Sequence, residues 1–123
     1  MVKTVSTQKK KTRLKKKLDR EIQLKYVPLN PNCLVCGGQT SCMHHYIFKS
    51  QSNYLRYDER NLVPLCLHCH TLLHKCGDPR INQQIVRIKG HEWADELQRD
   101  RRKPFNDTLA NLQEIWNETV KDT

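Results

Sequence analysis

Two Cys-x-x-Cys sequences constrain the fold of this chain more than any other feature. They are formed by Cys33 and Cys36 and by Cys66 and Cys69. Two such pairs can surround one Zn²⁺ with four thiolates and leave no open coordination position, which is typical of a structural site. A chain of 123 residues buries only a modest core. We therefore expect this four-cysteine zinc knot to contribute much of the folding free energy.

Disulfide bridges are the other use that six cysteines could have. They would suit a secreted protein, but the segment from Met1 to Leu18 is polar and lysine-rich and lacks the apolar core of a signal peptide. No apolar run approaches the length of a membrane span. We therefore expect a cytoplasmic protein with reduced cysteines. The two cysteines outside the pairs, Cys42 and Cys76, are either small buried residues or a redox pair.

Positive charge is concentrated at the N-terminus. Residues 1–20 contain nine lysines and arginines and a single acidic residue, Asp19, so they carry a net +8 of the chain's +9. Such a block can neutralise several phosphates without reading a base sequence. A solvated tail and a localisation signal are the alternatives, and only a nucleic-acid function found elsewhere in the chain decides between them.

The apolar pattern predicts mainly helices around a cysteine- and histidine-rich centre. We expect disorder in residues 1 to about 12 and a basic helix over 13–26 that ends at Pro28. Asp78 and Pro79 predict the start of another helix, with Gly90 as its stop. Further helices are expected over 91–103 and from about Thr108. The expected divisions are a basic arm (1–26), a zinc-stabilised core (27–78) and a C-terminal helical extension packed on that core (79–123).

Four histidines have the spacing of a catalytic metal site. His70 and His74 are four residues apart, so they share one face of a helix that begins near Cys69. His44 and His45 are neighbours in an expected strand, residues 42–48, so their side chains point in opposite directions. One can face the ion while the other faces the substrate. Three imidazoles with an open position are typical of a catalytic rather than a structural ion.

The order of these residues resembles the HNH (ββα-metal) endonuclease family. It is carried by Met43-His44-His45-Tyr46-Ile47 and by Asn61-Leu62-Val63-Pro64-Leu65-Cys66. The resemblance implies an α+β fold in which two antiparallel strands and a helix surround one divalent ion, flanked by the basic helix and the C-terminal helices. It implies that His45 is the general base and that Asn61 braces the loop between strand and helix so that His45 is correctly turned. It also implies that His44, His70 and His74 hold the ion. The spacing is similar to that of colicin-type DNases, which lack the cysteine knot.

A looser resemblance points to phage NinG/Rap recombination endonucleases, which act on branched DNA. It is carried by Lys17-Leu18-Asp19-Arg20, by the segment from Leu55 to Asn61 and by Gly90-His91-Glu92-Trp93. The chain differs from that pattern at His44, where a glycine is typical, and at His70, where an asparagine is typical. The resemblance implies a bacterial or phage-infected cell as the setting.

We therefore expect a metal-dependent DNA endonuclease with one structural Zn²⁺ and one catalytic Mg²⁺, Mn²⁺ or Zn²⁺. Side chains expected to hold flanking phosphates are those of Lys49, Arg56 and Arg60. Two alternatives stay open: a zinc module that binds nucleic acid without cleaving it, and a sequence-specific nuclease of the homing or restriction type. The sequence leaves the oligomeric state and the choice between linear and branched DNA undetermined.

Overall fold

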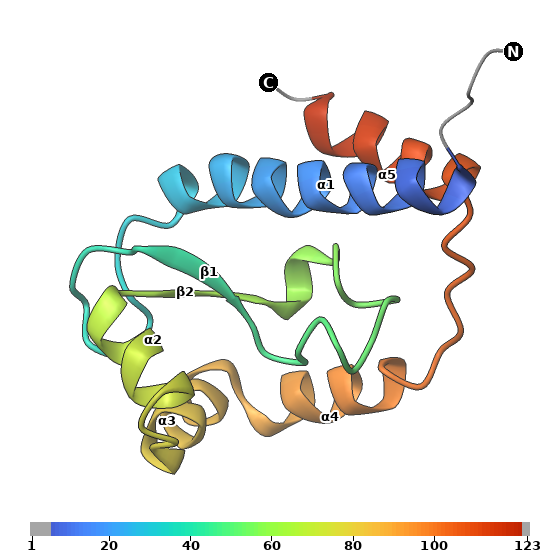
Figure 1. Cartoon of the computed structure of the whole chain (residues 1–123). Helices are drawn as coiled ribbons and strands as arrows, with labels where there is room; N and C mark the ends of the chain where they lie inside the picture. The colour runs from blue at the N-terminus through green and yellow to red at the C-terminus, as the bar shows by residue number, and fades with distance from the viewer. Residues whose placement is uncertain (1–5, 122–123) are drawn as a thin grey trace, which may run out of the picture.

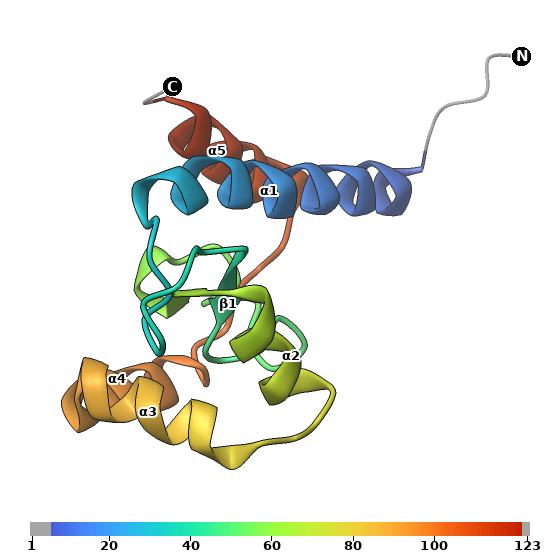
Figure 2. The same ribbon diagram turned by 90° about the vertical axis from the view of Figure 1, so that its left-hand side faces the viewer.

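The computed structural model describes residues 6–121. Its elements follow the order α1 (Thr7–Leu29), β1 (Cys42–His45), a short 3-10 helix η1 (Glu59–Asn61), β2 (Leu62–Leu65), α2 (Leu67–His74), α3 (Pro79–Lys89), α4 (His91–Asp100) and α5 (Leu109–Val120). Figures 1 and 2 show three layers: α1 and α5 lie on one side of the strands, and α3 and α4 lie on the other. The expected α+β class is confirmed.

The two strands form an antiparallel pair that places the histidines at one end. Cys42 lies opposite Leu65, and His45 lies opposite Leu62. Met43 lies opposite Pro64 at a position where the backbone groups of both residues point away from the partner strand, so the missing N–H of Pro64 costs no ladder bond. There the side-chain amide of Gln23, on α1, donates to the Met43 carbonyl (2.9 Å) and accepts from the Met43 N–H (2.8 Å). Helix α1 therefore covers the free edge of β1.

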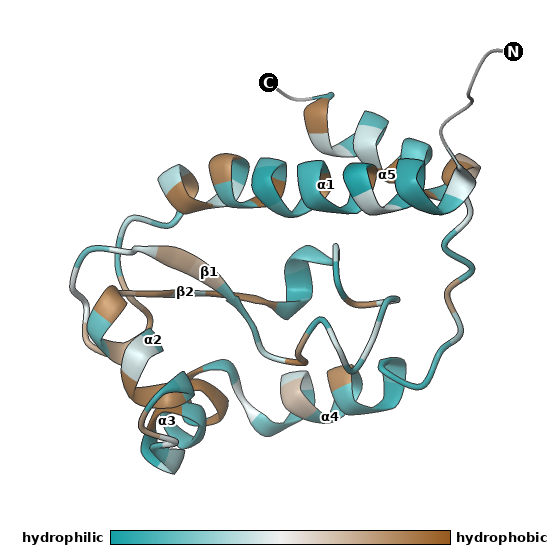
Figure 3. Ribbon diagram, in the orientation of Figure 1, coloured by the Kyte–Doolittle hydropathy of each residue, from teal (hydrophilic) through white to brown (hydrophobic). Residues whose placement is uncertain are grey.

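Three buried apolar clusters attach the helices to the strands. One joins β2 to the first cysteine pair, α2 and α3, and contains Cys33, Val63, Leu65, Cys69, Ile81 and Ile85. A second joins α1 to both strands through Ile22, Met43 and Leu62. The third joins the loop after β1 to α4 through Ile47, Leu55 and Leu97. Burying one leucine or isoleucine side chain contributes about 1.5–3 kcal/mol, so these clusters stabilise all three layers. In Figure 3, β2 is largely brown, while the visible face of α1 is largely teal.

Helix α1 is longer than the sequence predicted. The expectation of disorder is wrong for residues 7–12, which are helical, because the Ser6 side chain caps the helix by accepting from the Lys9 N–H (3.2 Å). Residues 1–5 lie outside the described residues. The C-terminus also extends further than expected: Pro28 lies in the last turn, and the Asn30 side chain donates to the Tyr26 carbonyl (2.8 Å).

The C-terminal helices start and stop close to where the sequence predicts. Asp78 caps α3 with Pro79 in its first turn, and Gly90, with a φ of 100°, ends it. Helix α4 ends at Asp100, three residues earlier than expected, and α5 begins after its cap Thr108. Helix α5 packs on α1, where Lys11 and Lys15 form ion pairs with Asp107. Between residues 6 and 121 we find no helix with the length and apolar character needed to cross a bilayer.

Candidate metal centres

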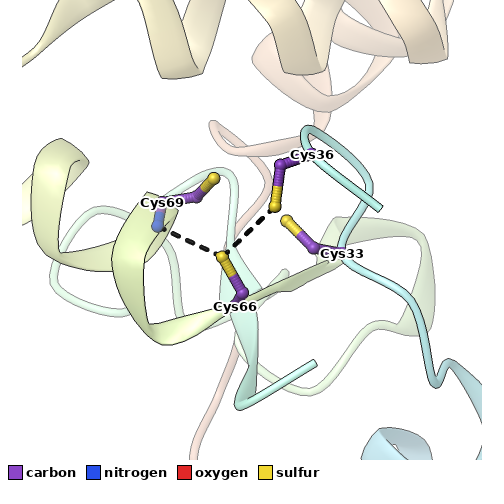
Figure 4. A group of neighbouring side chains, drawn as sticks. All are labelled: Cys33, Cys36, Cys66 and Cys69. Carbon is purple, nitrogen blue, oxygen red and sulfur yellow. Dashed lines mark hydrogen bonds between the residues drawn. The ribbon is translucent and has the colours of Figure 1, made fainter. Parts of the chain in front are cut away.

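The four cysteines of the two Cys-x-x-Cys sequences converge on one point (Figure 4). Their Sγ atoms all lie within 4.8 Å of one another, and those of Cys36 and Cys66 are 3.5 Å apart. Four sulfurs around a tetrahedral Zn²⁺ are separated by about 3.8 Å, as follows from a Zn–S distance of about 2.3 Å. All six cysteines of the chain are free thiols. The four are therefore close enough to hold one metal ion, as the sequence predicted.

Backbone N–H groups point at these sulfurs from both turns. The Gly38 N–H donates to Cys36 Sγ (3.4 Å), and the Cys69 N–H donates to Cys66 Sγ (3.3 Å), which also caps α2. Burial raises the pKa of Cys33, but backbone hydrogen bonds outweigh it and lower that pKa to about 7. Burial and the neighbouring thiols raise the pKa of Cys69 instead. Four thiols this close cannot all ionise together without a cation among them, so the donor set fits a divalent ion.

A second cluster lies at the other end of α2 and consists of His44, His70 and His74. One ring nitrogen from each lies within 4.8 Å of the other two. His44 Nδ1 and His74 Nε2 are 3.3 Å apart, and a tetrahedral zinc site with a Zn–N distance of about 2.05 Å would separate two nitrogens by about 3.3 Å. The structure therefore brings together the three histidines that the sequence selected.

The electrostatics favour neutral imidazoles, the form that binds metal, at His44 and His70. Burial, followed by the nearness of His70 and His74, lowers the pKa of His44 to about 3. Burial also lowers the pKa of His70. Within residues 6–121, His44 Nε2 is buried and has no hydrogen-bond partner. Converging neutral nitrogens repel one another unless they share a proton or a cation, so this donor set fits a divalent ion with room for further ligands.

Two residues beside the histidine cluster were not assigned a site role from the sequence. Cys42 Sγ lies 3.4 Å from His70 Nδ1, a hydrogen bond that leaves Nε2 of His70 for an ion. Strand alternation was a usable signal here, because Cys42 and His44 are two residues apart and share one face of β1. Phe48 places its ring 5.8 Å from that of His44 and 5.4 Å from that of His74. It lies beyond the end of β1, although alternation along the strand expected over 42–48 also places it on the face of His44.

His45 is not part of the cluster, as expected for a neighbour of His44 on a strand, although it lines the same cavity. Its Nε2 lies 2.9 Å from the backbone carbonyl of Arg56. A carbonyl can only accept, so Nε2 carries the proton and Nδ1 keeps its lone pair. Burial is the main cause that lowers the pKa of His45, with Lys49 and Arg56 contributing in the same direction. His45 is therefore a neutral imidazole with one nitrogen available to accept a proton.

Asn61 is completely buried and connects the two ends of the loop that follows β1. Its Oδ1 accepts from the Ile47 N–H (2.7 Å), and its Nδ2 donates to the carbonyls of Ile47 (2.9 Å) and Leu55 (3.3 Å). The sequence placed its bracing role in a loop between strand and helix. The structure places it in the loop between the two strands. Because Leu55 precedes Arg56, Asn61 also holds the segment whose carbonyl binds His45.

The four candidate histidines line one cavity of about 270 Å³. It is lined by Gln23, Cys42, Met43, His44, His45, Phe48, Lys49, His70 and His74. Lys49 lies at this cavity and is half-exposed, and its Nζ is 3.7 Å from Oδ2 of Asp19. Both arginines expected to hold phosphates lie against carboxylates, and their contact with phosphates stays a prediction. Arg56 binds Asp19 through two hydrogen bonds, and Arg60 pairs with three carboxylates, those of Asp58, Glu96 and Asp100.

Comparison of the chain with known protein families, with curated proteins and with solved structures found no match.

Proposed function

We propose that this protein is a metal-dependent endonuclease of the HNH type that hydrolyses phosphodiester bonds in DNA. The observation that carries the proposal is the single cavity in which three converging imidazoles, those of His44, His70 and His74, lie beside His45. A general base with an available Nδ1 next to an open metal site is an arrangement that can hydrolyse a phosphodiester.

A divalent ion held by the three imidazoles would act as a Lewis acid that offsets the charge developing on the phosphate oxygens. His45 Nδ1 accepts a proton from the attacking water, while the Arg56 carbonyl stabilises the resulting imidazolium through Nε2–H. The new bond forms between the water oxygen and phosphorus, and the bond from phosphorus to the 3′ oxygen breaks. The 3′ oxygen leaves as an alcohol after taking a proton from solvent, so the products are a 5′-phosphate and a 3′-hydroxyl. Lys49 lies where it can pair with a neighbouring phosphate.

The charge on α1 supports DNA as the substrate. Four exposed cations three or four residues apart form one face of the helix, which we call the basic stripe: Lys9, Arg13, Lys16 and Arg20. Within the described part of the chain, none of them forms an ion pair. Lys11 and Lys15 differ, because both are paired with Asp107 beside α5. The stripe leads to Gln23, which lines the cavity, so phosphates bound along it would continue to the site.

For the cysteine cluster we propose a structural Zn²⁺. Four thiolates form a closed set that leaves no position for substrate, and soft sulfur ligands in tetrahedral geometry favour zinc or an iron–sulfur centre. A zinc module that binds nucleic acid without cleaving it is the competing function. It accounts for the cysteines and the basic stripe, but it requires only one ion. The converging histidines favour the nuclease, because they provide a second metal-binding set that such a module would not use.

The test is a cleavage assay with plasmid, linear, flap and four-way-junction DNA, each with added Mg²⁺, Mn²⁺ or Zn²⁺. We expect His45→Ala to lower the cleavage rate by a factor of about 10² to 10⁴ while DNA binding and folding persist. His68→Ala is the matched control, because His68 is exposed on α2 and outside both clusters. Full activity of the His45 variant would refute the assignment of the base. One bound ion per chain, with no cleavage of any substrate, would favour the binding module.

A further inference from the structure

Asp19 is the one acidic residue among the first twenty, and DNA binding alone gives no reason for it. A carboxylate beside the basic stripe opposes the binding of phosphates. In the structure its side chain is only 22% exposed and faces the loop after β1 rather than solvent. It accepts two hydrogen bonds from the guanidinium of Arg56, from Nε to Oδ1 (3.2 Å) and from Nη2 to Oδ2 (2.6 Å). Lys49 Nζ lies 3.7 Å from the same carboxylate.

Arg56 connects this carboxylate to the candidate base. Its side chain is held by Asp19 on α1, and its backbone carbonyl accepts from Nε2 of His45 (2.9 Å). A bidentate pair between arginine and carboxylate fixes both the position and the plane of the guanidinium. Asp19 and His45 are therefore joined through one residue, although they lie on α1 and β1.

Within its own loop, the backbone of Arg56 is held mainly through the preceding residue, Leu55. Leu55 is fixed through its N–H, which donates to Ser52 Oγ (3.1 Å), and through its carbonyl, which accepts from Asn61. The Arg56 N–H makes a longer bond, 3.4 Å, to the Asn53 carbonyl. The pair with Asp19 supplies the second anchor, so the direction of the Arg56 carbonyl depends on α1.

We propose that Asp19 is a positioning residue for His45, which it orients through Arg56. The carbonyl of Arg56 selects the tautomer of His45 that carries its proton on Nε2, so Nδ1 keeps its lone pair on a ring that lines the cavity. Without Asp19, the Arg56 carbonyl is free to turn and the imidazole can exchange between tautomers and ring orientations. An effect of Asp19 on the cleavage rate rests on the function proposed above. Its effect on the tautomer and orientation of the His45 ring does not depend on that function.

The test compares Asp19→Asn with Asp107→Asn on the zinc-loaded protein at one pH. Both changes remove one negative charge, and both break an ion pair made by α1, but only the first contacts Arg56. Ring ¹⁵N NMR reports the tautomer of His45 directly. We expect the Nε2–H form alone in the native protein and in Asp107→Asn, and a mixture of forms in Asp19→Asn. Asp19→Glu, which retains a carboxylate, should restore much of the native signal.

Cleavage kinetics provide the second measurement. We expect Asp19→Asn to lower kcat about tenfold, the size of effect seen when a group that orients a site residue is lost. DNA affinity should stay equal or rise, because a negative charge has been removed near the basic stripe. A general loss of structure would weaken both kcat and binding.

The two proposals fail in different ways. If the native protein cleaves no DNA, the nuclease is refuted, while the NMR measurement still decides the role of Asp19. If the His45 signal and kcat of Asp19→Asn match those of Asp107→Asn, the positioning role is refuted. Should Asp19→Asn fail to fold, Arg56→Lys keeps the charge but cannot form the bidentate pair, and an unchanged His45 signal in that variant would equally refute the proposal.

Discussion

Removing the side chain of Asn61 should be among the most destabilising single changes in this protein. Asn61→Ala deletes three hydrogen bonds, with lengths of 2.7, 2.9 and 3.3 Å, at a residue that is 0% exposed. It leaves the N–H and carbonyl of Ile47 and the carbonyl of Leu55 with fewer partners in the interior. A net loss of roughly 1 kcal/mol per bond, with a further cost for buried groups left unpaired, gives a total of about 3–5 kcal/mol. The free energy of unfolding of a typical domain is only about 5–15 kcal/mol.

The assay is equilibrium urea unfolding at a fixed concentration of free Zn²⁺, because metal bound only to the native state adds to its stability. The free energy of unfolding of a small protein falls by about 2 kcal/mol per molar of urea. The loss of stability in Asn61→Ala should therefore lower the urea concentration at half-unfolding by about 2 M. Asn61→Asp is the second variant. It keeps the acceptor for the Ile47 N–H but replaces the donor with an oxygen that faces two carbonyls, so it should be no more stable than Asn61→Ala.

The control is Asn53→Ala in the same loop. Asn53 is exposed, and its side chain makes no hydrogen bond within residues 6–121. Its midpoint should stay within about 0.3 M of the native value, since surface changes usually cost less than about 0.5 kcal/mol. If Asn61→Ala shifted the midpoint no more than this control does, the argument that Asn61 holds both ends of the loop would be wrong.

Three further predictions concern the metal sites and the basic stripe. Cys66→Ser should remove the structural ion and most of the folded state, as judged by metal content and circular dichroism; a folded, zinc-free variant would contradict the role of the knot. Cys42→Ala should weaken the ion bound by the histidines about 10- to 100-fold in a competition titration with a chelator, because it releases His70 Nδ1, whereas the exposed Cys76→Ala should have no effect. Replacing Arg13 and Lys16 by Gln should reduce the slope of log Kd against log salt by about 2, while the same change at Lys11 and Lys15 should leave it unchanged; equal slopes for both pairs would refute the division of α1 into a stripe and a packed face.

The sequence predicted those parts of the structure that depend on spacing along the chain. The pattern His-x-x-x-His placed two imidazoles on one side of α2, and alternation along β1 turned His44 and His45 apart. The helix ends at Asp78 and Gly90 were predicted from capping chemistry, and the start near Thr108 was predicted from the apolar pattern of the last helix. In each case the interacting groups lie within one or two turns of each other, so local physics suffices.

The features that were missed depend on residues far apart in the sequence. Arg56 and Arg60 were expected to bind phosphates, because all of their carboxylate partners except Asp58 lie far away in the sequence. Arg56 pairs with a carboxylate 37 residues away, and Arg60 pairs with two that are 36 and 40 residues away. The strand expected over 42–48 ends at His45 for a related reason, because the Ile47 N–H is bound by the side chain of Asn61 instead of a partner strand.

Helix α2 explains why one short segment can serve two metal clusters. Cys69 and His70 are consecutive, yet successive residues of a helix point about 100° apart, so Cys69 joins the cysteines while His70 joins His44 and His74. The start of α2 is fixed by Cys66, which is both the helix cap and a member of the cysteine cluster. A shift of the helix by one residue would rotate both histidines by about 100° away from His44. The cysteine cluster therefore sets the direction of the histidines, so the chemistry proposed for the cavity depends on a cluster whose side chains do not line it.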